Sequence, residues 1–96
     1  MAGVNSYEVV MVFSLKDGEE APQALLEKFK ALIEANGTIS NVDEWGKRRL
    51  AYPINDEPEG FYVLINFESG PEFPAELDRV LKITDGVLRS LIISKN

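Results

Sequence analysis

The chain is organised around the stretch Asp43-Glu44-Trp45-Gly46-Lys47-Arg48-Arg49-Leu50-Ala51-Tyr52-Pro53-Ile54. Most of it belongs to a long predicted strand, residues 38–52, which Pro53 limits because proline cannot donate a ladder hydrogen bond. Gly46 inside this strand predicts a bulge or a bend. Residues 55–60 are rich in turn formers, so we expect the strand to fold back on residues 61–67 as a hairpin. This hairpin decides how the other elements can be arranged.

The other elements follow from apolar periodicity and from turn signals. The predicted order is β-α-β-β-α-β, over residues 7–13, 19 or 21–36, 38–52, 61–67, 74–82 and 87–93. The first and third strands are apolar on both faces, which is typical of central strands. Two split units with right-handed crossovers give a four-stranded antiparallel sheet with two helices on one face. We therefore predict one α+β domain of the ferredoxin-like class over residues 1–96.

The two faces of the predicted sheet differ in what covers them. The first helix turns one apolar stripe toward the sheet, formed by Leu25, Leu26, Phe29, Leu32 and Ile33. Gly37 is expected to end this helix. The opposite face presents apolar residues without helix cover, namely Val10, Val12, Tyr62 and Leu64. Because such a patch is rarely left in water, we predict that a partner covers it; the alternative is that scattered apolar residues are merely tolerated there.

Charge is distributed unevenly along the chain. The 96 residues carry 10 Lys or Arg and 16 Asp or Glu, a net charge of −6. Two positive islands, residues 47–49 and 79–95, interrupt an acidic sequence. The Debye length is about 8–10 Å at physiological salt, so distant acidic groups are largely screened. A focused cationic patch can therefore still bind phosphate despite the negative net charge. On an extended backbone Lys47 and Arg49 share one side and Arg48 takes the other. The alternative is that the three cations only protect an edge strand from aggregation.

The composition argues against most kinds of catalytic site. The chain has no Cys and no His, so it lacks a thiolate metal site and the commonest base and metal ligand. Its serines have no His to activate them, and no glycine-rich phosphate loop precedes a helix. No apolar run reaches the roughly 18–20 residues of a membrane span, and a basic-then-apolar signal peptide is lacking. We predict an intracellular protein that is not an enzyme and has no catalytic residues, metal or cofactor.

Several motifs resemble the bacterial small-subunit ribosomal protein S-six (S6) family. The most specific is the run Trp45-Gly46-Lys47-Arg48-Arg49-Leu50-Ala51-Tyr52-Pro53-Ile54-Asn55. It is accompanied by Tyr7-Glu8-Val9-Val10, by Gly37, by Gly60-Phe61-Tyr62-Val63-Leu64 and by Ile83-Thr84-Asp85-Gly86-Val87-Leu88-Arg89-Ser90. The resemblance spans roughly residues 7–95. It implies the same ferredoxin-like fold that the periodicity predicts.

The resemblance also implies a structural role in translation, in the cytoplasm and within the ribosome. Family members bind the central domain of small-subunit ribosomal RNA as a heterodimer with the basic ribosomal protein S-eighteen (S18). Carried over position by position, Lys47, Arg48 and Arg49 become candidate phosphate contacts, with Arg89 as a further candidate. Tyr52 becomes a candidate for the RNA or partner surface, where it would join Val10, Val12, Tyr62 and Leu64.

Two departures and one alternative qualify these expectations. Residues 2–6 lack the basic side chains that family members commonly carry there, so the resemblance does not extend to an RNA contact at that point. Trp45 is expected to pack against the protein, since Trp usually buries most of its ring. The ribosomal interpretation expects a free monomer with no membrane association. The alternative is a ferredoxin-like regulatory module that binds a small ligand, self-associates through its sheet and leaves residues 47–49 solvated.

Overall fold

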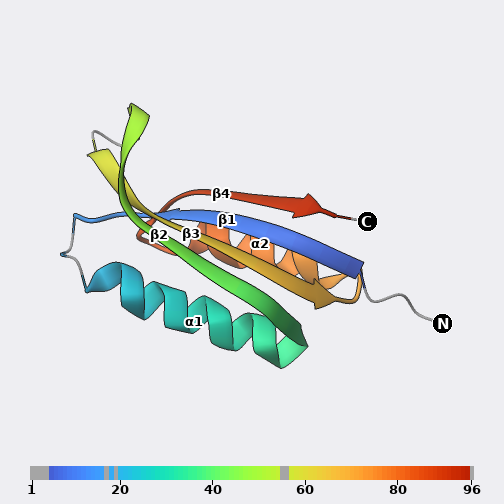
Figure 1. Cartoon of the computed structure of the whole chain (residues 1–96). Coiled ribbons are helices and arrows are strands. Elements are labelled where there is room, and N and C mark those ends of the chain that lie inside the picture. The colour runs from blue at the N-terminus through green and yellow to red at the C-terminus, as the bar shows by residue number, and fades with distance from the viewer. Residues whose placement is uncertain (1–4, 17, 19, 55–56, 96) are drawn as a thin grey trace.

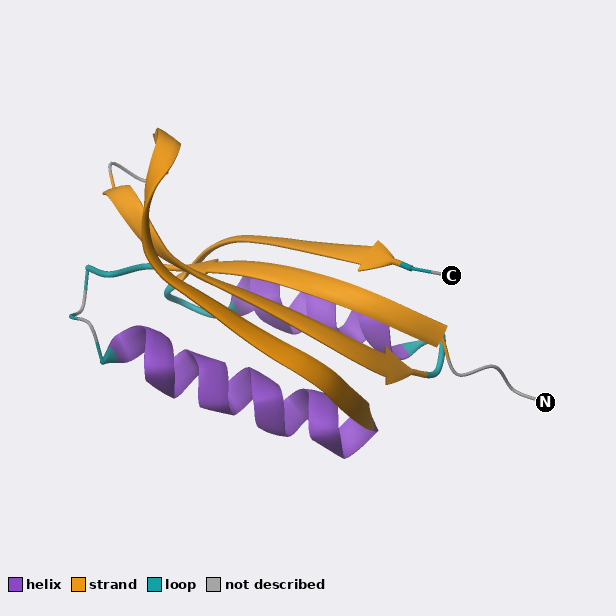
Figure 2. Ribbon diagram, viewed as in Figure 1, coloured by secondary structure: helices purple, strands orange, loops and turns teal. Residues whose placement is uncertain are grey.

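The computed structural model describes residues 5–16, 18, 20–54 and 57–95, with Ala51, Pro53 and Ile54 described by their main chain only. The elements are β1 (Asn5–Phe13), α1 (Ala21–Asn36), β2 (Gly37–Ile54), β3 (Glu57–Ser69), α2 (Phe73–Ile83) and β4 (Val87–Ser94) (Figure 1). The strands form one antiparallel sheet in the order β2-β3-β1-β4. Both helices lie on the same face of this sheet (Figure 2). The predicted ferredoxin-like fold is confirmed, with β1 and β3 as the central strands.

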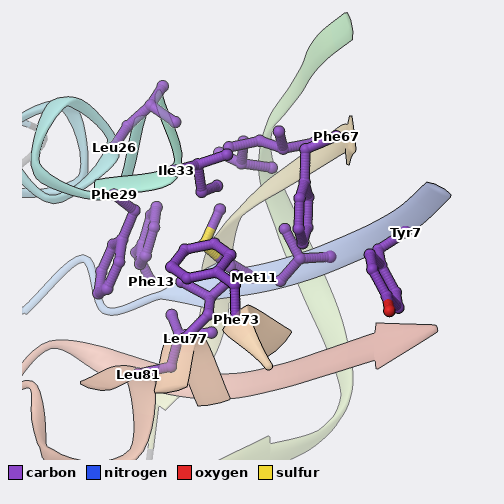
Figure 3. Close-up of a cluster of buried hydrophobic side chains, with 13 residues drawn as sticks. Tyr7, Met11, Phe13, Leu26, Phe29, Ile33, Phe67, Phe73, Leu77 and Leu81 are labelled. Carbon is purple, nitrogen blue, oxygen red and sulfur yellow. The ribbon is translucent and has the colours of Figure 1, made fainter. Parts of the chain in front are cut away.

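The core lies between the sheet and the two helices (Figure 3). From the strands it takes alternate residues, as expected of side chains that share one face: Tyr7, Val9, Met11, Phe13, Val63, Ile65 and Phe67. The helices contribute Leu26, Phe29, Ile33, Phe73, Leu77 and Leu81. Leu25 and Leu32 pack against the edge of this cluster, so the predicted stripe of α1 is confirmed. The rings of Phe13 and Phe29 stack at a centroid distance of 6.2 Å.

The β2–β3 hairpin extends beyond the end of β1 as an arm, which we define as residues 48–54 and 57–60. In Figure 1 this arm rises from the sheet at the end opposite to the start of β1. The expectation that residues 57–60 form a turn is wrong, because β3 already begins at Glu57 and pairs with β2. Residues 57–60, which precede Phe61 in β3, pair with β2, and no pairing of these residues with β1 is described. Pro58 is tolerated there because a strand with one neighbour does not need every backbone donor. Residues 55 and 56 of the predicted turn lie outside the described residues.

Gly37 ends α1, as predicted, and its backbone is extended. Its φ of −173° and ψ of −154° are extended, so it is the first residue of β2 rather than a left-handed cap. The requirement for glycine is steric. A Cβ at this position would collide with the carbonyl oxygen of Glu68 and lie 3.0 Å from the Cβ of Ser69. Glycine therefore allows β2 to pair with β3 immediately after the helix.

Replacing Gly37 by alanine is expected to lower the free energy of unfolding by about 2–3 kcal/mol, because the obstructing atom belongs to the backbone and cannot rotate away. Urea unfolding followed by circular dichroism measures this change. The matched control is Thr38→Ala at the neighbouring exposed position, for which we expect a loss of at most about 1 kcal/mol. Equal midpoints for the two variants would contradict the steric explanation.

Candidate nucleic-acid interface

The face of the sheet opposite to the helices, here called the open face, is arranged in rows that run across the four strands. Residues directly paired in an antiparallel ladder point to the same face. One row joins Gly46 of β2, Tyr62 of β3, Val12 of β1 and Arg89 of β4. The next row joins Asp43, Leu64, Val10 and Leu91. The register therefore brings the four apolar residues singled out from the sequence onto one surface.

This surface is larger than the sequence suggested. Leu91 is 56% exposed and Ile93 is 43% exposed, and both lie on β4 beside β1. Sequence reasoning missed them as site residues, although the alternation of residues 87–93 already places them on one side of a strand. We call the set the apolar patch: Val10, Val12, Trp45, Tyr62, Leu64, Leu91 and Ile93. A hollow of about 190 Å³ indents it, lined by Val10, Val12, Tyr62, Arg89, Ser90 and Leu91.

Trp45 belongs to the patch because of a β-bulge. The register of β2 against β3 shifts between Glu44 and Gly46, and Gly46 has a φ of +82°, a conformation that favours glycine. The indole ring stacks on Tyr62 at a centroid distance of 6.2 Å, and its Nε1–H donates to Asp43 Oδ2 at 2.9 Å. The predicted packing is confirmed. The bulge nevertheless leaves Trp45 42% exposed on the open face.

The three consecutive cations divide between the two faces, as the alternation predicted. Lys47 pairs with Phe61 and Arg49 with Glu59, whereas Arg48 pairs with Gly60. Phe61 packs against the core, so Lys47 and Arg49 lie on the helix side. Arg48 lies toward the open face, where its Nε–H donates to the Trp45 carbonyl oxygen at 3.4 Å. All three side chains are exposed.

The second positive island is not one unit in space. Arg79 donates to Glu76 through Nε at 3.1 Å and Nη2 at 2.7 Å, and Lys82 pairs with Asp78 at 2.9 Å. The hydrogen bonds from Arg79 lower the pKa of Glu76, and those same bonds raise the pKa of Arg79. Both pairs lie within α2. Of this island, Arg89 lies on the open face in the row of Tyr62 and Val12, and Lys95 reaches the same face at Asn66.

The open face thus has a cationic end and an end that carries two carboxylates beside Lys95, whose Nζ donates to Asn66 Oδ1 at 2.9 Å. Arg48 and Arg89 lie at the end nearest to the hairpin arm, on strands separated by β3 and β1, which is about 14 Å across the sheet. Glu8 and Glu68 occupy the rows at the other end, opposite Asn66 and Ser6 respectively. The apolar patch lies between the two ends.

Tyr52 is placed apart from the patch. It is 82% exposed and lies in the hairpin arm, beyond the point where the β2 register shifts between Arg49 and Ile54. The structure therefore groups Tyr52 with the cations of the arm rather than with Val10 and Tyr62. Its role in binding stays a prediction.

Two further features of the structure concern membrane insertion and metal binding. Within the described residues, no helix is both long and apolar enough to cross a membrane. The same part of the chain contains no group of three or more acidic, His or Cys side chains arranged to hold a metal ion.

The sequence and the fold both match known proteins. Residues 6–94 match the family model of ribosomal protein S6. The small ribosomal subunit protein bS6 of Caldanaerobacter subterraneus is 56% identical over 91 residues, which cover 94% of this chain and 96% of that protein. The bS6 protein of Clostridium novyi is 50% identical over 92 residues, covering 95% and 97% respectively. The crystal structure of 30S ribosomal protein S6 from Thermotoga maritima superposes with a TM-score of 0.90 at 27% identity, covering 97% of this chain and 89% of that one. The chain therefore belongs to the ribosomal protein S6 family, whose members are proteins of the small ribosomal subunit.

Proposed function

We propose that this protein binds the central domain of small-subunit ribosomal RNA as a structural component, together with the basic ribosomal protein S18. The observation that carries the proposal is the composition of the open face. One surface combines an apolar patch, in which Val12 is buried and the other side chains are half-buried or exposed, with arginines at one end and carboxylates beside Lys95 at the other. An apolar centre with a charged rim suits a protein partner, and clustered exposed cations suit phosphate. No step of this function requires catalysis or a cofactor.

The apolar patch is the proposed docking site for S18. Arg89 stands beside the hollow lined by Val10, Tyr62 and Leu91, which has room for one anchoring side chain of the partner. The carboxylates of Glu8, Glu68 and Asp43 would attract a basic protein and increase its rate of association.

The hairpin cations are the proposed RNA contacts. Lys47, Arg48 and Arg49 are exposed on the hairpin beside the patch, Arg48 toward the open face and the other two toward the helix side, so a partner on the patch would leave them accessible to phosphates. Three phosphate contacts give a slope of log affinity against log salt of only about −2 to −3. Such a small electrostatic term makes the isolated chain a weak RNA ligand. The partner would supply further contacts on a continuous surface.

Titration of a central-domain RNA fragment with the chain alone, and then with the preformed pair, tests the proposal. We expect weak binding by the chain alone and at least about 100-fold tighter binding by the pair. Replacing Lys47, Arg48 and Arg49 together by Gln should weaken the binding of the pair on the order of 100-fold at 0.1 M salt and reduce the salt slope by about two to three. The melting temperature should stay unchanged, because the three side chains are exposed.

The matched control removes the same charge elsewhere. Lys28, Arg79 and Lys82 are exposed cations of the helices, and their joint replacement by Gln changes the net charge equally. We expect this variant to keep the affinity of the pair within about threefold, since contacts beyond a Debye length are screened. Equal RNA affinity of the chain alone and of the pair would count against the proposal, as would equal losses in both triple variants.

The regulatory-module alternative predicts a different assembly. In that case the apolar patch would be covered by a second copy of this chain. Sedimentation of the purified chain distinguishes the two: a monomer that pairs only with the basic partner supports the ribosomal role, and a tight homodimer supports self-association.

A further inference from the structure

We infer that Ser14 is a positioning residue for RNA binding, because it bonds both to the hairpin that carries Lys47, Arg48 and Arg49 and to the turn that leads into Arg89. This inference rests on the proposed function. Ser14 directly follows β1 and is buried, with 7% of its surface exposed. It is joined by hydrogen bonds to two segments that are distant from it in sequence. One segment is the start of β3, which pairs with the strand that carries the hairpin cations, and the other leads into Arg89.

The side chain of Ser14 ties down the hairpin arm. Its hydroxyl donates to the carboxylate of Glu57, lying 2.7 Å from Oε1 and 2.9 Å from Oε2. Glu57 is the first residue of β3 and pairs with Ile54, so it lies near the far end of the arm. The same hydroxyl oxygen accepts the N–H of Lys16 at 3.0 Å, which orients the hydroxyl group. This link spans 43 residues of sequence.

The main chain of Ser14 ties down the start of β4. Its N–H donates to the carbonyl oxygen of Gly86 at 2.6 Å, and β4 begins at the next residue, Val87. Arg89 follows two residues later, in the row of Val12. Hydrogen bonds of Ser14 therefore help to fix the positions of both Arg89 and the hairpin cations.

The link matters for the outer part of the arm, because the buried Leu50 and Gly60 anchor only its inner part. Residues 57–60 of β3 have no described pairing with β1, and the register of the β2–β3 ladder shifts between Arg49 and Ile54. A two-stranded ribbon is at best marginally stable by itself. Without the Ser14–Glu57 hydrogen bond the part of the arm beyond Leu50 would sample more directions. Ordering the hairpin cations against phosphates would then cost conformational entropy, which weakens RNA binding.

The test uses the pair with S18 and the central-domain RNA fragment. Ser14→Ala and Glu57→Ala are each expected to weaken RNA binding about tenfold, the loss of between one and two phosphate contacts. Glu57→Gln keeps an oxygen acceptor for Ser14 and removes the same charge as Glu57→Ala. It should restore the affinity to within about threefold of the wild type, which separates the hydrogen bond from the charge.

The matched control for the loss of a buried hydroxyl is Ser69→Ala. Ser69 is 2% exposed, and its Oγ donates to the Gly70 carbonyl oxygen at 3.0 Å, at the opposite end of β3 from the arm. This variant should lose stability like Ser14→Ala and keep the RNA affinity. Hydrogen exchange provides a second measurement that needs no RNA. The amides of the arm should exchange about tenfold faster in Ser14→Ala and Glu57→Ala, but not in Glu57→Gln or Ser69→Ala.

Two results would overturn the inference while leaving the proposed function intact. One is an RNA affinity of Ser14→Ala equal to that of Ser69→Ala. The other is a Glu57→Gln variant that binds as weakly as Glu57→Ala. If the wild-type pair fails to bind the RNA, the proposed function fails instead, and unchanged exchange of the arm amides would then separately refute the role of Ser14.

Discussion

Replacing Phe29 by alanine is expected to lower the free energy of unfolding by about 3–5 kcal/mol. Phe29 is fully buried, stacks on Phe13 of β1 and lies on the one helix face that meets the sheet. Removing its ring leaves a cavity between α1 and two central strands, where a close-packed core cannot collapse fully. Domains of this size have a total stability of roughly 5–15 kcal/mol, so the variant would lose a large share of it.

Urea or guanidinium unfolding at 25 °C measures this effect, with the denaturant dependence checked for an unchanged slope. Phe29→Leu should cost less than half as much, because it keeps most of the buried volume. Glu27→Ala lies on the exposed side of the same helix and removes only a 3.6 Å surface ion pair with Lys30. We expect it to change the stability by less than about 0.5 kcal/mol. A loss below about 1 kcal/mol for Phe29→Ala would contradict the assigned core.

The fold was predictable because its central elements carry redundant local signals. Tyr7, Val9, Met11 and Phe13 alternate along β1, and the stripe containing Leu26, Phe29 and Ile33 has the helical period. Each pattern fixes both the type of element and the face that it buries. With two helices and four strands in this order, right-handed crossovers leave few alternatives to the observed sheet.

The features that sequence reasoning missed depend on partners that are far away in the chain. Residues 57–60 contain turn formers, yet they continue β3 because β2 pairs with them and Glu57 is held by Ser14. Local propensity cannot include such a contact, and tertiary pairing overrides it. The exposure of Trp45 has the same origin. Gly46 predicted the bulge, but only the register against Tyr62 reveals that the bulge turns the indole ring onto the open face.

The candidate site was predictable in part for related reasons. The alternation of Lys47, Arg48 and Arg49 follows from any extended backbone. The separation in space of the cations of residues 79–95 could not be predicted in this way. It depends on the pairing of Arg79 with Glu76 inside a helix, while Arg89 lies on a strand. The roles of Lys47, Arg48, Arg49 and Arg89 as RNA contacts stay predictions.

Replacing Leu91 by lysine is expected to weaken the association with S18 about 100-fold or more. Leu91 is 56% exposed, lines the hollow and lies beside Val10 in the apolar patch. A lysine there would place an ammonium group in a surface that the partner must dehydrate, opposite a protein that is itself basic. Like charges at an interface cost several kcal/mol, and the loss of an apolar anchor adds to this cost. Isothermal titration of the pair measures the change.

The sign of the introduced charge separates docking on the patch from a general loss of structure. Leu91→Glu removes the same apolar contact but presents a carboxylate to a basic partner, so its loss should be smaller, about tenfold. Ile83→Lys is the positional control, because Ile83 is 67% exposed but ends α2 on the helix side of the sheet. It should leave the affinity within about twofold of the wild type. Because neither residue is buried, all three variants should melt within a few degrees of the wild type. Equal affinities of Leu91→Lys and Ile83→Lys for the partner would contradict docking on the apolar patch. An equal loss of affinity in Leu91→Glu and Leu91→Lys would contradict a contribution of charge complementarity.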